Sequence, residues 1–347
     1  MFSVAQENMR IRRNEMKKTE TKSRSIRQLS MKMAAVFSAV IFCTTGGYTS
    51  VKADSLKDVI TKTAKYDTET VTDPTVASIG GEWTVMPLAR GNIDVPDNYF
   101  EKYRANVEKN LKENDGVLSD YKYTEYSRVI LALKSTGADP SDIGGYDLQK
   151  PLEDFDTVTS QGLNGAVYAL LALNADDPVG HKDQDLEKKY LNYILEQEKI
   201  DGGFALDTNS DQADIDMTAM TLQCLEPYQD QEEVKEAIEK GIEILAAGQE
   251  ENGGYVAYGS DSSESVSQVI IALSTYGIDC NEDERFIKNK KGLYDTLMEY
   301  QQKDGGFSHT LDGESDGMAT DQAFCALVSY ERMKNGENSF YNMTDQK

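Results

Sequence analysis

QEKIDGGF at residues 197–204, QEENGGY at 249–255 and QQKDGGF at 301–307 are three copies of one motif. Successive copies begin 52 residues apart, a period typical of repeat architectures. Each copy follows a helical pattern and precedes an acidic loop and then an apolar helix. The paired glycines predict a turn with positive φ and close backbone approach at the end of the first helix of each repeat.

Two kinds of helix alternate along the chain. Amphipathic helices are predicted at 98–114, 185–197, 232–248 and 283–302. Helices that are apolar on nearly every face are predicted at 125–134, 165–173, 217–225, 265–273 and 319–327. A helix that is apolar all round must be buried all round, so these form an inner ring inside the amphipathic helices. With shorter elements at 54–67, around Trp83 and at 151–155, we expect an all-α fold, an α6/α6 toroid of about six helical hairpins.

The Gln-x-x-x-Gly-Gly-Phe/Tyr turn, followed by a helix rich in Thr or Ser, resembles the prenyltransferase and squalene-oxidase repeat. The resemblance implies the α/α toroid of terpenoid cyclases, protein prenyltransferase β subunits and the cobalamin carriers of the transcobalamin and intrinsic-factor family. Clear repeats cover 197–330, with weaker ones at 123–133 and 161–173. Residues 339–345 also resemble the end of this module in secreted proteins of Gram-positive bacteria.

Residues 1–53 are expected to be a signal peptide with a basic leader, ahead of a single α/α toroid domain at 54–347. The basic stretch 17–32 precedes an apolar run at 33–47 that is too short to span a bilayer comfortably. Val51-Lys52-Ala53 is a small-x-small cleavage pattern. We therefore expect a secreted or cell-wall-associated protein with no membrane span after cleavage.

The mature chain is expected to begin at Asp54, and translation could start at either Met1 or Met16. Residues 54–347 carry 26 Lys or Arg against 57 Asp or Glu, a formal charge of −31. Such a surface disfavours nucleic acid and anionic lipid and favours cations or basic partners. A solvated acidic surface with no special role explains the charge equally simply.

Three cysteines lie beyond the leader, at Cys224, Cys280 and Cys325. Their odd number and wide spacing do not suit a disulfide framework. Cys224 and Cys325 fall inside predicted apolar helices, so we expect them to be small buried hydrophobic side chains.

Asp214-Ile215-Asp216-Met217-Thr218-Ala219 resembles the Asp-x-Asp-Asp-Thr-Ala motif of class II terpenoid cyclases. In that family the middle acid donates a proton to an alkene, a role the resemblance would give to Asp216 with Asp214 beside it. Met217 replaces the third acid of the motif, and one tryptophan leaves little for an aromatic wall around a carbocation. The simpler interpretation is that Asp216 caps the inner helix or lies on a wet rim.

Metal chemistry has two weak candidates. A zinc site would combine Asp321 and Cys325, one helical turn apart, with His309; the remaining histidine, His181, lies in a loop. The protein prenyltransferase spacing, Asp-x-Cys with a distant His, is not present. Calcium could use oxygen ligands at alternating positions, although the Gly and Glu of an EF-hand are missing: Asp207, Asn209, Asp211, Asp214 and Asp216. The sequence therefore assigns no metal or other cofactor.

Seven further side chains at or near inner-helix positions would line the central cavity of a toroid or its mouth: Trp83, Tyr123, Tyr126, Arg128, Gln161, Tyr168 and Gln268. The favoured function is a secreted or cell-surface, non-catalytic module that holds a small molecule, a cell-surface ligand or a protein partner. The alternative is an enzyme similar to squalene–hopene cyclases, with Asp216 as proton donor.

Overall fold

The computed structural model describes residues 54–177, 184–257 and 259–346. The predicted signal peptide and its cleavage position, and the loop that holds His181, lie outside the described residues. The compact unit begins at Asp54. Among the described residues, no helix combines the length and apolarity needed to cross a bilayer.

The inner helices of this unit are α3 (Glu82–Arg90), α5 (Tyr123–Ser135), α7 (Leu163–Asn174), α9 (Ile215–Leu225), α11 (Ser263–Thr275) and α13 (Gly317–Asn335). The outer helices are α2 (Leu56–Thr70), α4 (Tyr99–Glu113), α6 (Phe155–Thr159), α8 (Gln184–Glu196), α10 (Glu232–Ala247) and α12 (Leu293–Leu297). Short 3₁₀ turns are η1 (Lys150–Glu153), η2 (Glu226–Tyr228), η3 (Glu284–Phe286) and η4 (Met298–Tyr300). Strands β1 (Val256–Ala257) and β2 (Ser260–Asp261) form a small antiparallel hairpin, with Val256 opposite Asp261.

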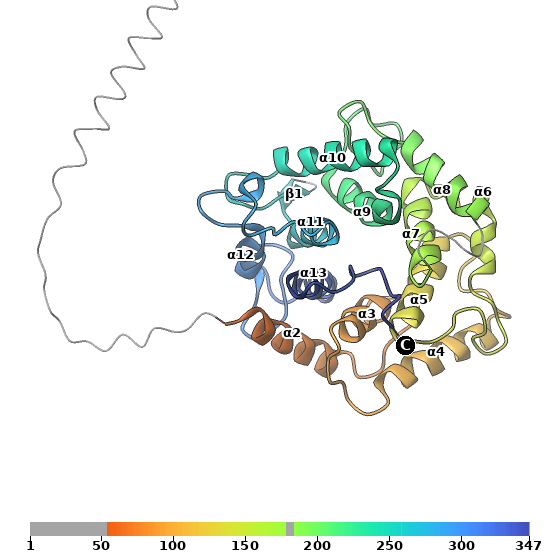
Figure 1. Cartoon of the computed structure of the whole chain (residues 1–347). Coiled ribbons are helices and arrows are strands. Elements are labelled where there is room, and N and C mark those ends of the chain that lie inside the picture. The colour runs from red at the N-terminus through yellow and green to blue at the C-terminus, as the bar shows by residue number, and fades with distance from the viewer. Residues whose placement is uncertain (1–53, 178–183, 258, 347) are drawn as a thin grey trace, which may run out of the picture. The chain divides into compact units, whose positions relative to one another are not determined.

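Each inner helix contacts the next one along the chain, and α13 contacts α3. The six inner helices of the described residues therefore contact one another in a ring, with the other helices arranged around it (Figure 1). The predicted all-α toroid is confirmed.

Burial follows the two sequence patterns. In the outer helix α4, the buried side chains are those of the predicted stripe: Tyr99, Tyr103, Val107 and Leu111. In the inner helix α7 nearly every side chain is buried, from Leu163 to Asn174. Cys224 and Cys325 are free and buried, as predicted, and Cys280, for which burial was not predicted, is free and buried too.

The three Gly-Gly turns share one geometry. The first glycine of each pair has a positive φ: 95° at Gly202, 92° at Gly253 and 98° at Gly305. In each turn the second glycine's carbonyl accepts a backbone hydrogen bond from the residue four positions earlier, at 2.8–2.9 Å. A Cβ on Gly305 would lie 2.6 Å from the carbonyl oxygen of Lys62 in α2. The predicted need for positive φ and close approach is confirmed.

The prediction of one amphipathic helix over 283–302 is wrong. This stretch holds η3, then the short helix α12, then η4. Asn289 and Lys290 have positive φ, and Lys288 pairs with Lys291 as an isolated β-bridge. A Cβ on Gly292 would lie 2.5 Å from Cα of Asn281, so a turn packed against 281 interrupts the helical period.

Candidate functional site

Six segments join an outer helix to the next inner helix, and they gather at one end of the ring. We call this end the loop pole, made of residues 71–81, 114–122, 160–162, 197–214, 248–262 and 301–316. Neighbouring repeats contact one another there, each through a loop-pole segment and the first turn of an adjacent inner helix: Ser263 N of α11 donates to the His309 carbonyl oxygen at 3.1 Å. Thr124 N donates to Oε1 of Gln161 at 3.2 Å, and a Cβ on Gly317 would lie 3.5 Å from Cγ2 of Ile79.

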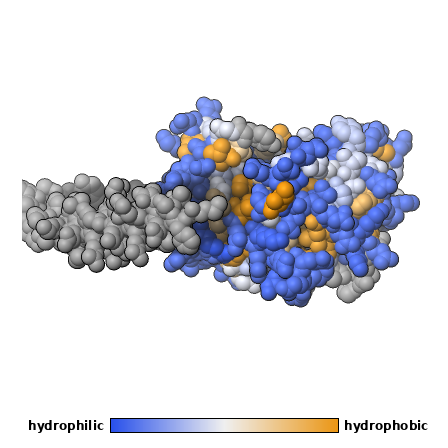
Figure 2. Space-filling model, turned by 90° about the horizontal axis from the view of Figure 1, so that it is seen from above, coloured by the Kyte–Doolittle hydropathy of each residue, from blue (hydrophilic) through white to orange (hydrophobic). Residues whose placement is uncertain are grey.

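Exposed apolar side chains distinguish this end of the ring. Every exposed large hydrophobic residue of the described chain lies in a loop-pole segment or in the first turn of α13: Ile79, Val117, Tyr121, Ile200, Leu206, Val256, Leu311 and Met318. Figure 2 shows the ring from the side, where the surface is mostly hydrophilic with small separate apolar areas. Scattered single exposed hydrophobics are ordinary in proteins, whereas gathering at one end indicates an interaction surface.

The same segments are strongly acidic. Together they carry fifteen Asp or Glu residues and three Lys, at 122, 199 and 303. Lys199 Nζ donates to the Thr208 carbonyl oxygen at 3.1 Å, and Lys122 Nζ lies 5.6 Å from the centre of the Tyr121 ring. The loop pole therefore combines exposed apolar groups with a negative potential.

A pocket of about 650 Å³ opens between segments 197–214 and 248–262. Its walls include apolar, hydroxyl and acidic side chains from α9, α11 and these loops: Leu206, Asp207, Asp214, Asp216, Val256 and Ser265. No aromatic side chain is among the described lining residues. The pocket can hold a polar or cationic group beside an apolar one.

Asp214 is the N-cap of α9. Its Oδ1 accepts from Met217 N and its Oδ2 from Leu206 N, both at 2.7 Å. Ser262 and Asp316 cap α11 and α13 in the same way. The prediction that Asp216 caps this helix is therefore wrong, because the cap lies two residues earlier.

Asp216 instead lies in the first turn of α9 and is partly buried. Burial raises the pKa of its carboxyl, the nearby charges of Asp214 and Glu264 raise it further, and a hydrogen bond with the Ser265 side chain opposes the shift. Its Oδ1 is buried and has no hydrogen-bond partner among the described residues. A carboxyl in this setting can keep a proton at higher pH than a surface one.

Glu264 occupies the matching first-turn position of α11. The hydroxyls of Ser262 and Ser263 donate to its Oε2 at 3.2 and 3.3 Å, and His309 Nδ1 lies 2.7 Å from the same oxygen. His309 comes from segment 301–316, so this contact also joins two repeats across the loop pole.

Comparison with known proteins agrees with the ring and its repeated turns. The profile of the prenyltransferase alpha-alpha toroid domain matches residues 148–346. The chain belongs to this family. A solved structure titled as a polysaccharide lyase resembles this toroid with a TM-score of 0.49 at 12% identity, covering 81% of this chain and 97% of the other. No curated protein sequence matches the toroid.

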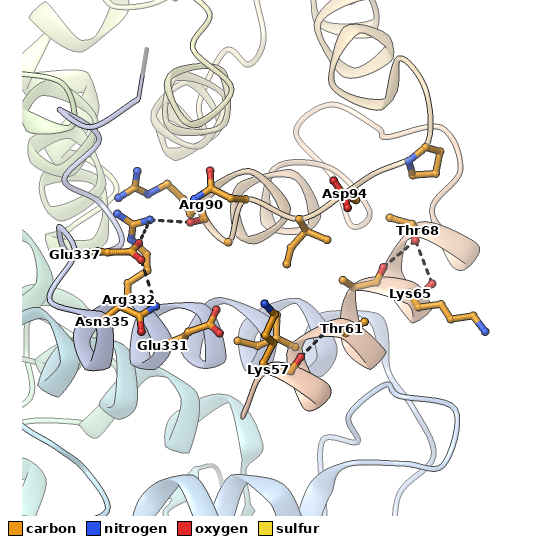
Figure 3. Close-up of a pocket in the computed structure, with 16 residues that line it drawn as sticks. Lys57, Thr61, Lys65, Thr68, Arg90, Asp94, Glu331, Arg332, Asn335 and Glu337 are labelled. Atoms are coloured by element: carbon orange, nitrogen blue, oxygen red, sulfur yellow. Dashed lines mark hydrogen bonds and ion pairs between the residues drawn. The ribbon is translucent and has the colours of Figure 1, made fainter. Parts of the chain in front are cut away.

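A second pocket of the toroid, about 730 Å³, lies at the opposite pole between α2, α13 and the end of α3 (Figure 3). Two buried arginines border it, but both are used within the chain. The Arg90 guanidinium donates to the Phe340, Ser339 and Asn342 carbonyl oxygens and to Asp345. Arg332 donates to the Arg90 carbonyl oxygen, at 2.8 Å, and to Asp345. These arginines hold the C-terminal segment onto the ring, so their charges already have partners within the chain.

The seven predicted cavity residues form separate groups in the toroid. Tyr168 packs edge-on against Trp83, with ring centres 5.8 Å apart, and Tyr123 packs against Tyr126 at 5.3 Å. Gln161 joins the second group through its bond to Thr124 N, while Gln268 is buried between two other glutamines, Gln223 and Gln322. Nε of Arg128 is buried without a hydrogen-bond partner among the described residues. Burial raises the pKa of both Glu82 and Tyr168. The Arg128 charge opposes each of these shifts, so the three groups lie near one another.

The residues proposed as metal ligands do not converge. In the described part of the chain, no three His, Cys, Asp or Glu side chains are grouped as a metal site. Of the zinc candidates, Asp321 accepts from the Thr84 hydroxyl at 2.8 Å, and burial raises the pKa of Cys325 well above its usual value. Of the calcium candidates, Asp214 is used as the cap, and Asp207 Oδ1 accepts from Asn209 N at 2.9 Å.

One acidic cluster had no clear sequence signal. Asp67 from α2, Glu82 from α3 and Asp321 from α13 are all buried where the first and last helices meet. Burial raises the pKa of all three, and for Asp321, at about 7, the Glu82 carboxylate adds to the shift. Asp321 stood out as an acid in an apolar helix, but its partners are more than 230 residues away in the sequence.

Proposed function

We propose that this toroid is a secreted or cell-surface module that binds a ligand or partner at the loop pole without transforming it. The observation that carries the proposal is the gathering of all eight exposed large hydrophobic side chains of the described chain at that one pole. Solvent exposure of apolar groups is unfavourable, so a surface that concentrates them is typical of a binding face. The pocket between Leu206 and Val256 supplies a concave site within this face.

Binding at the mouth of the ring suits the packing better than binding deep along its axis. Tyr168 is packed against Trp83 and is 7% exposed. Tyr341, from the C-terminal segment, is also buried, and Tyr168 contributes to raising its pKa, so the two rings are near each other. These aromatic side chains act as packing within the ring, and the ligand contacts the loops.

An enzyme that uses Asp216 as proton donor is the second candidate. The raised pKa of Asp216 and its unpartnered Oδ1 favour it, because an acid catalyst needs a desolvated, protonated carboxyl. The described lining of the Asp216 pocket offers no aromatic ring to stabilise a carbocation. Residues 214–219 also lack the third acid of the cyclase motif. We therefore favour binding without catalysis.

The test is to expose immobilised toroid, residues 54–347, to culture fluid and cell-envelope extract of its native host. Bound material is identified by mass spectrometry. We expect a ligand that wild type retains chemically unchanged and that the double variant Leu206→Ser/Val256→Ser loses. The control Lys235→Ser, an exposed position on the outer helix α10, should retain it. A captured ligand that does not depend on Leu206 and Val256 contradicts the binding face. A ligand converted only when Asp216 is intact favours the enzyme.

Export is tested separately. We expect the secreted protein to begin at Asp54, because residues 51–53 fit a signal-peptidase site after an apolar run. N-terminal sequencing of material released by the native host measures this directly. An intact leader found in the membrane fraction would mean that residues 33–47 act as an anchor.

A further inference from the structure

We infer that the partner recognised at the loop pole is a basic polypeptide segment that also carries apolar side chains, an inference that rests on the binding face proposed above. The loop-pole segments carry five times as many acidic as basic residues. A cationic partner is attracted to such a face, whereas nucleic acid and anionic membranes are repelled.

The charge is available at the surface. Asp211, in a segment that lines the pocket, and Asp312 and Glu314, in segment 301–316, are exposed side chains. Asp261 of β2 lies opposite Val256, which is 46% exposed, so an acidic and an apolar side chain are neighbours in this hairpin. Tyr121 already has the Lys122 ammonium 5.6 Å from its ring centre, so a cation fits against its face.

The spread of the apolar groups indicates a chain-like ligand. Seven of the eight come from five of the six loop-pole segments and the eighth, Met318, from the first turn of α13; of all eight, Leu206 and Val256 line the pocket. A small amine could fill the pocket but would leave Ile79, Leu311 and Met318 exposed. An extended peptide can place one side chain in the pocket and lay others across the neighbouring loops at the same end of the ring.

The experiment measures binding of fluorescein-labelled 12-residue peptides to residues 54–347 by fluorescence anisotropy. The first peptide alternates Lys and Leu, the second Glu and Leu, the third Lys and Ser, and the fourth Gln and Leu. We expect the Lys–Leu peptide to bind at least about tenfold more tightly than each of the others, because charge and apolar burial both contribute. Its affinity should fall about tenfold or more between 50 and 500 mM salt, since exposed charges are screened.

Two sets of variants locate the site. The triple variant Asp211→Asn/Asp312→Asn/Glu314→Gln should weaken binding of the Lys–Leu peptide by roughly tenfold. The matched control neutralises three exposed acids at the opposite pole, Asp142→Asn/Glu153→Gln/Glu284→Gln, and changes the net charge equally. It should change the affinity by less than about twofold, because these three residues lie in connections from an inner helix to the next outer helix, outside the loop-pole segments. Leu206→Ser/Val256→Ser should weaken binding by about tenfold.

The possible results separate the two proposals. Equal loss in both charge triples would mean attraction by overall charge, and it overturns the inference. Equal or tighter binding of the Glu–Leu or Gln–Leu peptide, lost in Leu206→Ser/Val256→Ser, overturns the basic partner but leaves the binding face intact. Binding to phosphatidylglycerol vesicles but to none of the peptides also overturns it. In contrast, if Leu206→Ser/Val256→Ser still retains the ligand captured from the native host, the binding face itself is rejected.

Discussion

At the scale of single residues, Asp321 has an unusual position for an acid. It is 5% exposed, and its pKa is raised to about 7, mainly by burial, with the Glu82 and Asp316 carboxylates adding to the shift and the Thr84 hydroxyl opposing it. The folded pKa is higher than the unfolded value of 3.8, so the folded state binds the proton more tightly. The free energy of unfolding should therefore fall as the pH rises from about 4 through 7.

The variant Asp321→Asn tests whether the free energy of unfolding falls with rising pH because of this carboxyl. Asn keeps an oxygen that can accept from the Thr84 hydroxyl but carries no charge at any pH. Relative to wild type, the variant's stability should rise by roughly 2–3 kcal/mol between pH 5 and pH 8.5, because only wild type loses stability as Asp321 ionises in the folded state. Urea unfolding at both pH values measures the difference. The control Glu314→Gln, at an exposed site, should show a difference that does not change with pH; equal behaviour of both variants would refute the buried charge.

Asp214 gives a second residue-scale prediction. Asp214→Ala removes the acceptors for both Met217 N and Leu206 N and should cost about 1–2 kcal/mol of unfolding free energy. Asp214→Asn keeps one cap acceptor and should cost less. Asp211→Ala, exposed in the same loop, should stay within about 0.5 kcal/mol of wild type. A loss for Asp211→Ala as large as for Asp214→Ala would show that the loop, not the cap, determines the effect.

At the scale of elements, the Gly-Gly turns set how closely each outer helix approaches its neighbour. Gly305→Ala combines a φ of 98° with a Cβ 2.6 Å from the Lys62 carbonyl oxygen, so it should destabilise by roughly 2–4 kcal/mol. Gly145→Ala is the matched control, with a φ of 90° and nothing within 4 Å of the added Cβ, and should cost about 1 kcal/mol. Thermal unfolding of both proteins measures the difference. Equal costs would mean that the positive φ alone, and not the close approach to the Lys62 carbonyl oxygen, explains the need for glycine at position 305.

Most elements could be predicted from the sequence because their signals are local. The stripe from Tyr99 to Leu111 and the apolar runs of the inner helices carry a helical period that tertiary packing preserves. The interruption of 283–302 was not predictable, because it depends on Asn281 packing against Gly292. The cap of α9 was placed two residues late, since Asp214 and Asp216 are both suitable capping residues.

At the scale of the whole molecule, the ring joins its first and last helices. α2 and α3 both contact α13, and the buried Arg90 and Arg332 bind the C-terminal segment. Arg332→Met should lower the unfolding free energy by about 2–4 kcal/mol, because it removes the donor to the Asn338 and Arg90 carbonyl oxygens and leaves Asp345 with Arg90 as its arginine donor. Arg104→Met, exposed on α4, should change it by less than about 0.5 kcal/mol.

Arg332→Met is followed by far-ultraviolet circular dichroism during urea unfolding. We expect one cooperative transition at a lower midpoint, because the ring couples each helix to its neighbours. Two separate transitions in the wild-type toroid would contradict this coupling.

The candidate site was less predictable than the fold. Sequence reasoning placed Asp214 and Asp216 together, since they are two residues apart, and both line the pocket. It did not find the loop pole, because no segment contributes more than two exposed apolar residues and the gathering appears only when the ring brings them to one end. The cluster of Asp67, Glu82 and Asp321 was missed for the same reason, as it forms only where the two ends of the helical chain meet.

The central claim is that the loop pole is the binding face. Hydrogen–deuterium exchange of residues 54–347, with and without saturating Lys–Leu peptide, tests it most directly. The account predicts slower exchange confined to segments 71–81, 114–122, 197–214, 248–262 and 301–316, with the opposite pole unchanged. Protection at the opposite pole around Arg90 and Arg332, or on the outer faces of α4 and α10, would contradict it.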